Sequence, residues 1–361
     1  MPLRRTELVK PDGRRIWHYG SVPSAPAAAA GPQVSSEGLE LRWHPILEEW
    51  VIVAPERQDR TFLPPAEYCP LCPTRDGSLP TEVPWPDYEI AVFENRFPSF
   101  VRDAPAPDAQ RGPYRSERAI GACEVVLYAA EHDATLAGQP LERVERLVDV
   151  WADRYRELGA RSEVAYVFIF ENRGPEIGVT LTHPHGQIYA FPFVPPRAQR
   201  ELDAQARYRR RNGRCLGCDV VAAELREGRR IVARNDAFAA YVPYFARLPY
   251  EVHLSSVAHR PSIAQLTASE RRALAAVLKT VLMKYDNLWG RQLPFVMAMH
   301  QRPTDGRRYP GCHFRIEFSP PNRSVDRLKY LAGVETGAGT YINDARAEQT
   351  SAELRAAEPQ T

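Results

Sequence analysis

The sequence predicts an α+β protein made of two tandem units, each an antiparallel sheet with packed helices, related by internal duplication. Three observations support this fold class. Each half has a Cys-x-x-Cys pair, strand-like apolar runs, an amphipathic helix and a histidine near a strand, in the same order. Residues 123–132 align without a gap on residues 250–259, and both segments share Glu-Val-x-Leu and end in histidine. Strands interrupted by one long helix are typical of a layered α+β unit.

Four segments follow from this duplication. Residues 1–35 are expected to be flexible, because they include a low-complexity stretch rich in Pro and Ala at 22–33. The first unit is predicted to span residues 36–195 and the second residues 196–346, with a tail at 347–361.

The first unit contains one amphipathic helix between strands. The helix is predicted at 141–158, where apolar side chains recur at helical spacing, at Val144, Leu147, Val148, Trp151, Tyr155 and Leu158. Apolar runs bounded by polar or turn residues predict strands at 50–54, 88–93, 123–129 and 164–170, with a further run at 188–191.

The second unit repeats this order. A helix is predicted at 267–287, and Thr267-Ala-Ser-Glu270 forms a capping box at its start. Strands are predicted at 230–233 and 239–242, in the segment 250–259, and at 295–299.

The composition excludes several classes of function. The chain has 361 residues, of which 44% are hydrophobic and 25% charged, so it is long enough for two globular cores. A net charge of +2 gives no broad attraction to nucleic acid or to a membrane surface. Residues 1–20 lack the apolar core of a signal peptide, and no run of 18 apolar residues is present. We therefore expect a cytoplasmic protein that binds neither nucleic acid nor membranes.

Two Cys-x-x-Cys pairs indicate metal or redox chemistry rather than disulfides, in a chain of this size without a secretory signal. The duplication adds two histidines to each pair. The predicted ligand sets are Cys69, Cys72, His132 and His183 in the first unit, and Cys215, Cys218, His259 and His313 in the second. Two thiolates and two imidazoles suit tetrahedral zinc, and an ion with four protein ligands would be structural. A redox dithiol and a pair of reduced core cysteines are the alternatives for each Cys-x-x-Cys pair.

The stretch His183-Pro184-His185-Gly186-Gln187 is the predicted centre of the chemistry. Histidines one residue apart on a strand point to the same face, and Pro184 favours an edge strand or a strand end. If His183 is a metal ligand, His185 is free, and a neutral imidazole is an available nucleophile near neutral pH. Gln187 can donate its amide to a phosphoryl oxygen but cannot supply a proton. The leaving group should therefore need little protonation, as a sugar phosphate does.

The motif and several other segments resemble the galactose-1-phosphate uridylyltransferase family of the histidine-triad superfamily. The resemblance extends over about residues 38–345, and its clearest segments are residues 50–60, 69–72, 93–98, 183–187 and 329–344. It implies two histidine-triad-like units, bound zinc, and a homodimer in which each site borrows residues from the partner.

The resemblance also implies a ping-pong reaction. His185 would attack the α-phosphorus of UDP-glucose and release glucose 1-phosphate, and galactose 1-phosphate would then accept the uridylyl group. Gln187 would hold the phosphoryl oxygens. The other residues implied to contact the substrates are Arg57, Arg60, Asn95, Asn172, Thr180, Lys329 and Glu335.

The second unit departs from this pattern. Arg315 and Glu317 stand where the first unit has His185 and Gln187. Some family members bind iron in this region. An arginine cannot be a metal ligand, so the Cys2His2 set is preferred to an iron site built on Glu201 and His300.

Three other functions are compatible with parts of the sequence. An ADP-sugar phosphorylase or adenylyltransferase would use the same His185, because the sequence does not fix the base. A zinc-stabilised binding protein with a dead site is disfavoured by the intact His185 and Gln187. A redox protein built on the Cys-x-x-Cys pairs is disfavoured by the repeated histidines.

Overall fold

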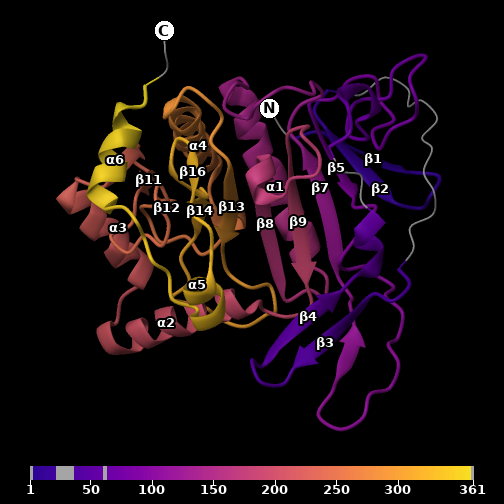
Figure 1. Ribbon diagram of the computed structural model, residues 1–361, viewed down its shortest axis with the longest axis horizontal. Helices are drawn as coiled ribbons and strands as arrows, with labels where there is room; N and C mark the ends of the chain where they lie inside the picture. The colour runs from indigo at the N-terminus through magenta and orange to yellow at the C-terminus, as the bar shows by residue number, and fades with distance from the viewer. Residues whose placement is uncertain (1–2, 22–35, 60–62, 359–361) are drawn as a thin grey trace.

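The computed structural model describes residues 3–21, 36–59 and 63–358, and its main feature is one continuous antiparallel sheet (Figure 1). The eleven strands of this sheet, in spatial order, are β1 (Arg5–Val9), β2 (Arg15–Tyr19), β5 (Ile90–Glu94), β7 (Ala122–Leu127), β9 (His185–Phe191), β8 (Tyr166–Arg173), β13 (Phe295–His300), β14 (Arg315–Ser319), β12 (Val252–Ser256), β11 (Phe238–Tyr241) and β10 (Ile231–Arg234).

The duplication is visible in this order. Strands β8 and β13 pair at the centre of the sheet, with Phe295 opposite Arg173. Outward from this seam, β9, β7, β5 and β2 in one unit match β14, β12, β11 and β10 in the other. Hydrogen bonds across the seam therefore join the two units into a single sheet, and β1 adds an extra strand at one edge.

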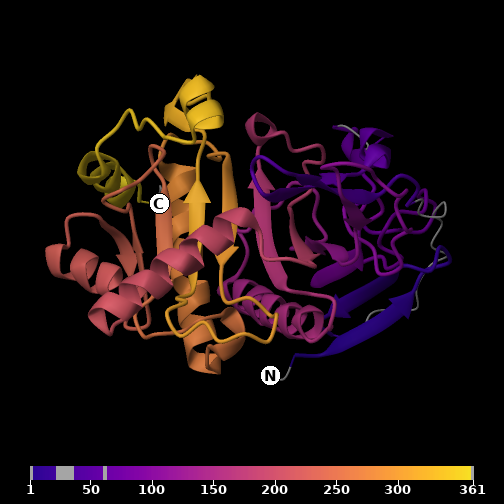
Figure 2. The ribbon, with the colours of Figure 1, turned by 90° about the horizontal axis from the view of Figure 1, so that it is seen from below.

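The two long helices predicted from periodicity are confirmed. They are α1 (Leu141–Gly159) and α4 (Ala268–Asn287), and α4 begins with the capping box of Thr267 and Glu270. The helices pack side by side on one face of the sheet and bury apolar residues from both units in a single core (Figure 2). The remaining helices are α2 (Pro196–Asn212), α3 (Leu216–Glu227), α5 (Gly333–Ala338) and α6 (Ala347–Ala356).

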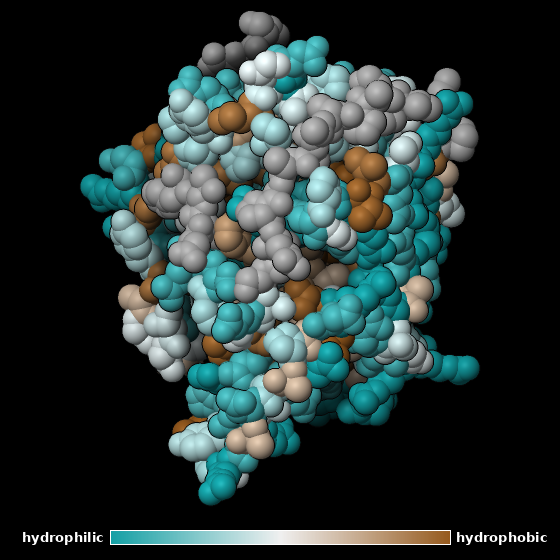
Figure 3. Space-filling model, turned by 90° about the vertical axis from the view of Figure 1, so that its right-hand side faces the viewer, coloured by the Kyte–Doolittle hydropathy of each residue, from teal (hydrophilic) through white to brown (hydrophobic). Residues whose placement is uncertain are grey.

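A second, smaller sheet covers the other face of the first unit. It consists of β4 (Glu49–Val53), β3 (Glu40–His44) and β6 (Ser116–Arg118). Its Leu41 and Trp50 pack with Tyr189 of β9 in a separate apolar cluster. A short hairpin of β15 (Asn322–Ser324) and β16 (Arg327–Leu328) completes the strands of the described residues. On the side of the first unit, the surface is mostly hydrophilic, with small separate hydrophobic patches (Figure 3).

Side chains alternate along β9 between the two faces of the large sheet. Ile188 and Ala190 lie in the core under α1, whereas Tyr189 lies in the cluster under β3 and β4. His185 and Gln187 share the parity of Tyr189, so they lie on the face away from α1.

Both chain ends are more ordered than predicted. Residues 5–19, expected to be flexible, form the hairpin of β1 and β2, and residues 22–33 lie outside the described part of the chain. The predicted tail contains α6, whose Leu354 is buried against the core. Helices α2 and α3 were not predicted.

The ungapped alignment of the two units is wrong by one residue within the strands. Leu127 lies opposite His185, whereas Ser255 lies opposite Arg315. If Arg315 corresponds to His185, the counterpart of Leu127 is Ser255 and not Leu254. The segment between this strand and the ligand histidine is therefore one residue longer in the first unit.

Among the described residues, no helix is both long enough and apolar enough to cross a membrane.

A buried ion pair ties α1 to β7. The Nε atom of Arg154 donates to Glu124 at 2.9 Å, both side chains are fully buried, and the guanidinium lies 4.0 Å from the ring centre of Trp17. Arg154 also pairs with the partly exposed Glu157 at 2.8 Å, but removal of Glu124 would leave the guanidinium without its fully buried partner. The pair therefore connects the helix, the sheet and the N-terminal hairpin.

We expect Glu124→Gln to lower the free energy of unfolding by about 3 kcal/mol, measured by urea denaturation. The double variant Arg154→Met and Glu124→Met should recover part of this loss, because no buried charge is left. Arg42→Met, which removes the exposed pair with Glu40, is the control and should cost less than about 1 kcal/mol. A loss of that small size in Glu124→Gln would contradict the prediction.

Candidate active site and metal-binding groups

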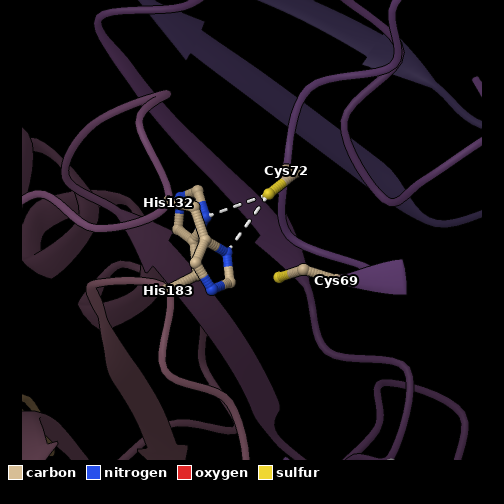
Figure 4. Close-up of side chains that lie close together, drawn as sticks. All are labelled: Cys69, Cys72, His132 and His183. Atoms are coloured by element: carbon tan, nitrogen blue, oxygen red, sulfur yellow. Dashed lines mark hydrogen bonds between the residues drawn. The ribbon is translucent and has the colours of Figure 1, made fainter. Parts of the chain in front are cut away.

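The first predicted ligand set comes together at the end of the large sheet (Figure 4). One ligand atom from each of Cys69, Cys72, His132 and His183 lies within 4.8 Å of all the others. The Sγ atom of Cys72 is 3.4 Å from Nδ1 of His132 and 3.6 Å from Nδ1 of His183. These side chains come from three segments far apart in the sequence, the Cys-x-x-Cys turn and one segment for each histidine, so the fold brings them together.

Hydrogen bonds orient both imidazoles toward the sulfur atoms. The Nε2 atom of His183 is 2.9 Å from the carbonyl oxygen of Ala129, so Nε2 carries the proton and Nδ1 is free for a metal. The Nε2 atom of His132 lies 3.0 Å from Oγ1 of Thr182. Burial lowers the pKa of His183 to about 4, which keeps this ring neutral, as a metal ligand must be.

The second ligand set has the same arrangement. Cys215, Cys218, His259 and His313 also have ligand atoms within 4.8 Å of one another. The Nε2 atom of His313 is 2.8 Å from the carbonyl oxygen of Ser256, and burial lowers the pKa of His313 to about 4. The second unit therefore repeats both the ligands and the hydrogen bond that orients a buried histidine.

The chemistry of the donors fits a metal ion. Burial, together with the neighbouring thiol, raises the pKa of Cys72 and of Cys218 to about 12. Thiols in such a place stay protonated unless a cation stabilises the thiolates. A soft or borderline divalent ion would supply that charge, so each group could hold one metal ion.

His185 lies at the first residue of β9, beside this group but not part of it. Its Nδ1 atom is 2.8 Å from the carbonyl oxygen of His183, to which it donates. Nε2 is therefore unprotonated, and burial lowers the pKa of His185 below its usual value. Because β9 begins at His185, the prediction that both imidazoles lie on one strand face is wrong. Pro184 does precede a strand, as predicted.

A pocket faces His185 and Gln187. Its polar lining includes Arg57, Asn95 and Thr180, and its apolar lining includes Leu71, Phe93, Val125 and Leu181; Pro70, Glu82, Arg96 and Phe97 complete it. The Nη1 atom of Arg57 donates to the carbonyl oxygen of Phe97 at 2.7 Å, which holds the guanidinium in place. The pocket thus combines an imidazole, an amide and a cation with apolar side chains.

Five of the predicted substrate and catalytic residues line this pocket, and three described ones do not. Asn172 is on β8, opposite Val296 of β13, and is not a lining residue. Lys329 and Glu335 form an ion pair of 3.2 Å with each other, and neither lines the pocket of their own chain. Arg60 lies outside the described residues.

Sequence reasoning missed Glu82 and the apolar lining residues Leu71, Phe93, Val125 and Leu181. An apolar residue of a binding slot has the same sequence pattern as a core residue, so no local signal marks it. Glu82 is separated from the motif by about a hundred residues and lies in a segment without helix or strand. Its place is decided by tertiary contacts alone.

The corresponding position in the second unit holds a network of charges. Arg315 Nη2 donates to Glu201 at 2.8 Å, and the other carboxylate oxygen of Glu201 is 3.0 Å from Nδ1 of His300. Glu317 is paired with Arg197 at 2.7 Å and with Arg247. These residues do not fit an iron site, because a guanidinium already neutralises Glu201. Glu251, His253 and Glu317 also converge, but the two arginines likewise supply the cations there.

Both halves of the chain match domains of one known family. Residues 34–195 match the profile of the N-terminal domain of galactose-1-phosphate uridyl transferase, and residues 201–359 match that of its C-terminal domain. A Thermotoga maritima protein named galactose-1-phosphate uridylyltransferase is 41% identical over 322 residues, covering 89% of this chain and 99% of the relative. A Streptomyces lividans protein of the same name is 36% identical, covering 96% and 94%.

Solved structures agree with these relatives. A structure described as uridylyltransferase is 33% identical, covers 88% of this chain and 98% of its own, and superposes with a TM-score of 0.79. An ADP-glucose phosphorylase from Arabidopsis thaliana covers 87% and 97% with a TM-score of 0.67. At 22% identity, the second likeness indicates the fold alone.

Gly186, which follows His185 in β9, packs closely against the side chain of Tyr128. A Cβ atom at Gly186 would lie 2.1 Å from the hydroxyl oxygen of Tyr128 and 3.2 Å from the carbonyl oxygen of Phe170. The same hydroxyl donates to Glu171 at 3.0 Å, and burial raises the pKa of Glu171 to about 7. Only glycine lets the buried Tyr128 pack this closely against the strand that carries His185.

We expect Gly186→Ala to lower the free energy of unfolding by about 2 kcal/mol, because the added methyl group overlaps the Tyr128 hydroxyl. Tyr128→Phe alone should cost about 1 kcal/mol through the lost hydrogen bond. Combined, the two changes should cost less than their sum, because the phenylalanine removes the clashing atom. Urea denaturation of the three variants measures this coupling, and simple additivity would contradict the packing argument.

Proposed function

The chain belongs to the galactose-1-phosphate uridyl transferase family, and we propose that it transfers the uridylyl group of UDP-glucose to galactose 1-phosphate through His185. The observation that carries this proposal is the hydrogen bond from Nδ1 of His185 to the carbonyl oxygen of His183, at 2.8 Å. It leaves the lone pair of Nε2 available in a pocket that also contains an amide and a guanidinium.

The reaction has two balanced steps. In the first, the Nε2 lone pair of His185 forms a bond to the α-phosphorus of UDP-glucose. The bond from that phosphorus to the bridging oxygen breaks, and glucose 1-phosphate leaves with the electron pair. In the second, a phosphate oxygen of galactose 1-phosphate attacks the same phosphorus, and the N–P bond breaks. The products are UDP-galactose and the free imidazole.

The residues of the pocket match what these steps require. A sugar phosphate is a weakly basic leaving group, so a general acid is not needed. The amide of Gln187 donates to a nonbridging oxygen as charge develops there. Arg57, Asn95 and Thr180 of the pocket hold the phosphates and the nucleoside together with Asn172 and Arg60, which are not among its described lining residues, and the apolar lining receives the base.

We also propose that the active protein is a homodimer. Lys329 and Glu335 are candidates for holding the hexose phosphate, yet neither lines the pocket of their own chain. Their segment protrudes with α5, on the side of the sheet opposite α1 and α4 (Figure 2). It exposes 75% of Tyr330, and Leu331 and Ile342 are also exposed. A partner chain that received this segment would cover these side chains and complete its own hexose site.

Zinc is the ion we propose for both Cys2His2 groups. Four protein ligands leave no open position, so each ion is structural and binds no substrate. Zinc bound by His183 would hold the backbone whose carbonyl oxygen orients His185. Binding of each ion would release the thiol protons.

Labelling tests the covalent step. The native chain, mixed with UDP-glucose labelled at the α-phosphate, should acquire about one acid-labile label per chain, located on His185. His185→Ala should acquire none and lose exchange activity by about 10⁴-fold or more. His44→Ala, which changes the last residue of β3, is the control and should be labelled normally. Labelling from ADP-glucose instead of UDP-glucose would favour an adenylyl transfer, and absence of any label would refute the proposal.

Elemental analysis tests the metal sites. We expect two zinc ions in each native chain, one in Cys72→Ser, one in Cys218→Ser and none when both changes are combined. Cys123→Ser is the control, because Cys123 is buried outside both groups, and it should keep two ions. If the native chain held only one ion, the ligand set whose substitution leaves the zinc content unchanged would not be a zinc site.

A further inference from the structure

The N-terminal hairpin lies directly against the candidate nucleotide pocket. Its strands β1 and β2 extend the large sheet next to β5, and its turn spans residues 10–14. The matched N-terminal family domain begins only at residue 34, so the hairpin precedes it in the sequence. The matched family profile therefore assigns the hairpin no role.

Two cations of this turn are buried, and both are directed at the wall of the pocket. Lys10 is 5% exposed and Arg14 is 6% exposed. The Nζ atom of Lys10 forms an ion pair with Glu82, and it lies 5.3 Å from the ring centre of Phe93. The Nη2 atom of Arg14 donates to Oε2 of Glu82 at 2.8 Å. Glu82 and Phe93 are both lining residues of the pocket.

The same turn also holds the part of the wall that contains Asn95. The Nη1 atom of Arg14 donates to the carbonyl oxygen of Glu94 at 3.0 Å. Glu94 directly precedes Asn95, whose side chain lines the pocket. Asp12 pairs with Arg14 at 2.6 Å, so two cations and two carboxylates balance within the buried cluster. A balanced buried cluster is costly to break, because each lost partner leaves an unpaired charge.

The wall needs these contacts because its own backbone is irregular. Between residues 69 and 89 the chain forms neither helix nor strand. The backbone N–H of Glu82 donates to the carbonyl oxygen of Pro70 at 2.9 Å, which links Glu82 to the Cys-x-x-Cys turn. The ion pairs from the hairpin hold the same residue from its other side. Glu82 is therefore fixed between the metal-binding group and the hairpin.

We propose that the hairpin is a working part of the nucleotide site, in which Lys10 and Arg14 are positioning residues that hold Glu82, Phe93 and Asn95 in the wall that receives the nucleoside. This inference rests on the function proposed above. Lys10 and Arg14 touch the wall and not the reacting phosphorus, so they affect how well the nucleotide binds before the transfer. Once the uridylyl group is attached to His185, galactose 1-phosphate binds where glucose 1-phosphate has left, and not at the wall that receives the nucleoside.

Single-turnover labelling tests this inference. In Lys10→Met and Arg14→Met, we expect the UDP-glucose concentration that gives half the maximal labelling rate to rise by about tenfold, with the maximal rate within about threefold of native. The dependence of uridylyl release on galactose 1-phosphate should be unchanged. Lys10→Arg keeps the positive charge, so its affinity for UDP-glucose should be close to native. If Lys10 acted only by filling space, Lys10→Arg would lose affinity as Lys10→Met does.

Arg5→Met is the matched control. Arg5 belongs to the same hairpin, but it pairs with Asp153 and Glu157 of α1 and not with the pocket wall. Its half-saturating concentration should match that of the native chain. An equal shift in Arg5→Met, or no shift in the Lys10 and Arg14 variants, would overturn the inference.

A final variant covers the case in which Lys10→Met or Arg14→Met does not fold. Glu82→Gln removes the charge of the wall residue while leaving both cations, and it should show the same loss of UDP-glucose affinity. A native affinity in Glu82→Gln would also overturn the inference. If the native chain itself takes no label, the proposed function fails and this inference fails with it. If the native chain is labelled and only the shifts are missing, the inference alone fails.

Discussion

One hydrogen bond, from Nδ1 of His185 to the carbonyl oxygen of His183, decides what the central motif can do. It fixes the proton on one nitrogen and leaves the other available. It also requires the backbone to turn at Pro184, so that one imidazole joins the Cys2His2 group and the next joins the pocket. The candidate nucleophile and one member of the Cys2His2 group therefore share a backbone segment of three residues, which couples their positions.

The two units share a fold and a ligand set, but they differ in chemistry. At the position of the free imidazole, the second unit has Arg315, whose charge is neutralised by Glu201. A saturated, buried guanidinium cannot attack phosphorus. The second unit instead supplies the strand that pairs with β8 and half of the core under α1 and α4. The second unit thus continues the sheet and the core of the first, and it also carries Lys329 and Glu335.

Local signals predicted the parts of the fold that depend on local interactions. Apolar periodicity and the capping box at Thr267 placed both long helices to within about two residues. The β1–β2 hairpin was missed because β1 is short and largely exposed, and β2 pairs with β5, about seventy residues away. The one-residue shift between the units was missed because an ungapped alignment cannot detect a longer connection.

By itself, the sequence determined the residue types of the site: two Cys2His2 sets in repeated order, and a histidine next to one of them with an amide two residues on. These are patterns of spacing, and spacing is visible in one dimension. Only the tertiary structure decided which side chains share the pocket with His185. Glu82, Leu71, Phe93 and Val125 come from separate segments, and their proximity results from strand pairing and from buried ion pairs between residues distant in the chain. Long-range contacts of this kind depend on the whole fold, so no short stretch of sequence contains them.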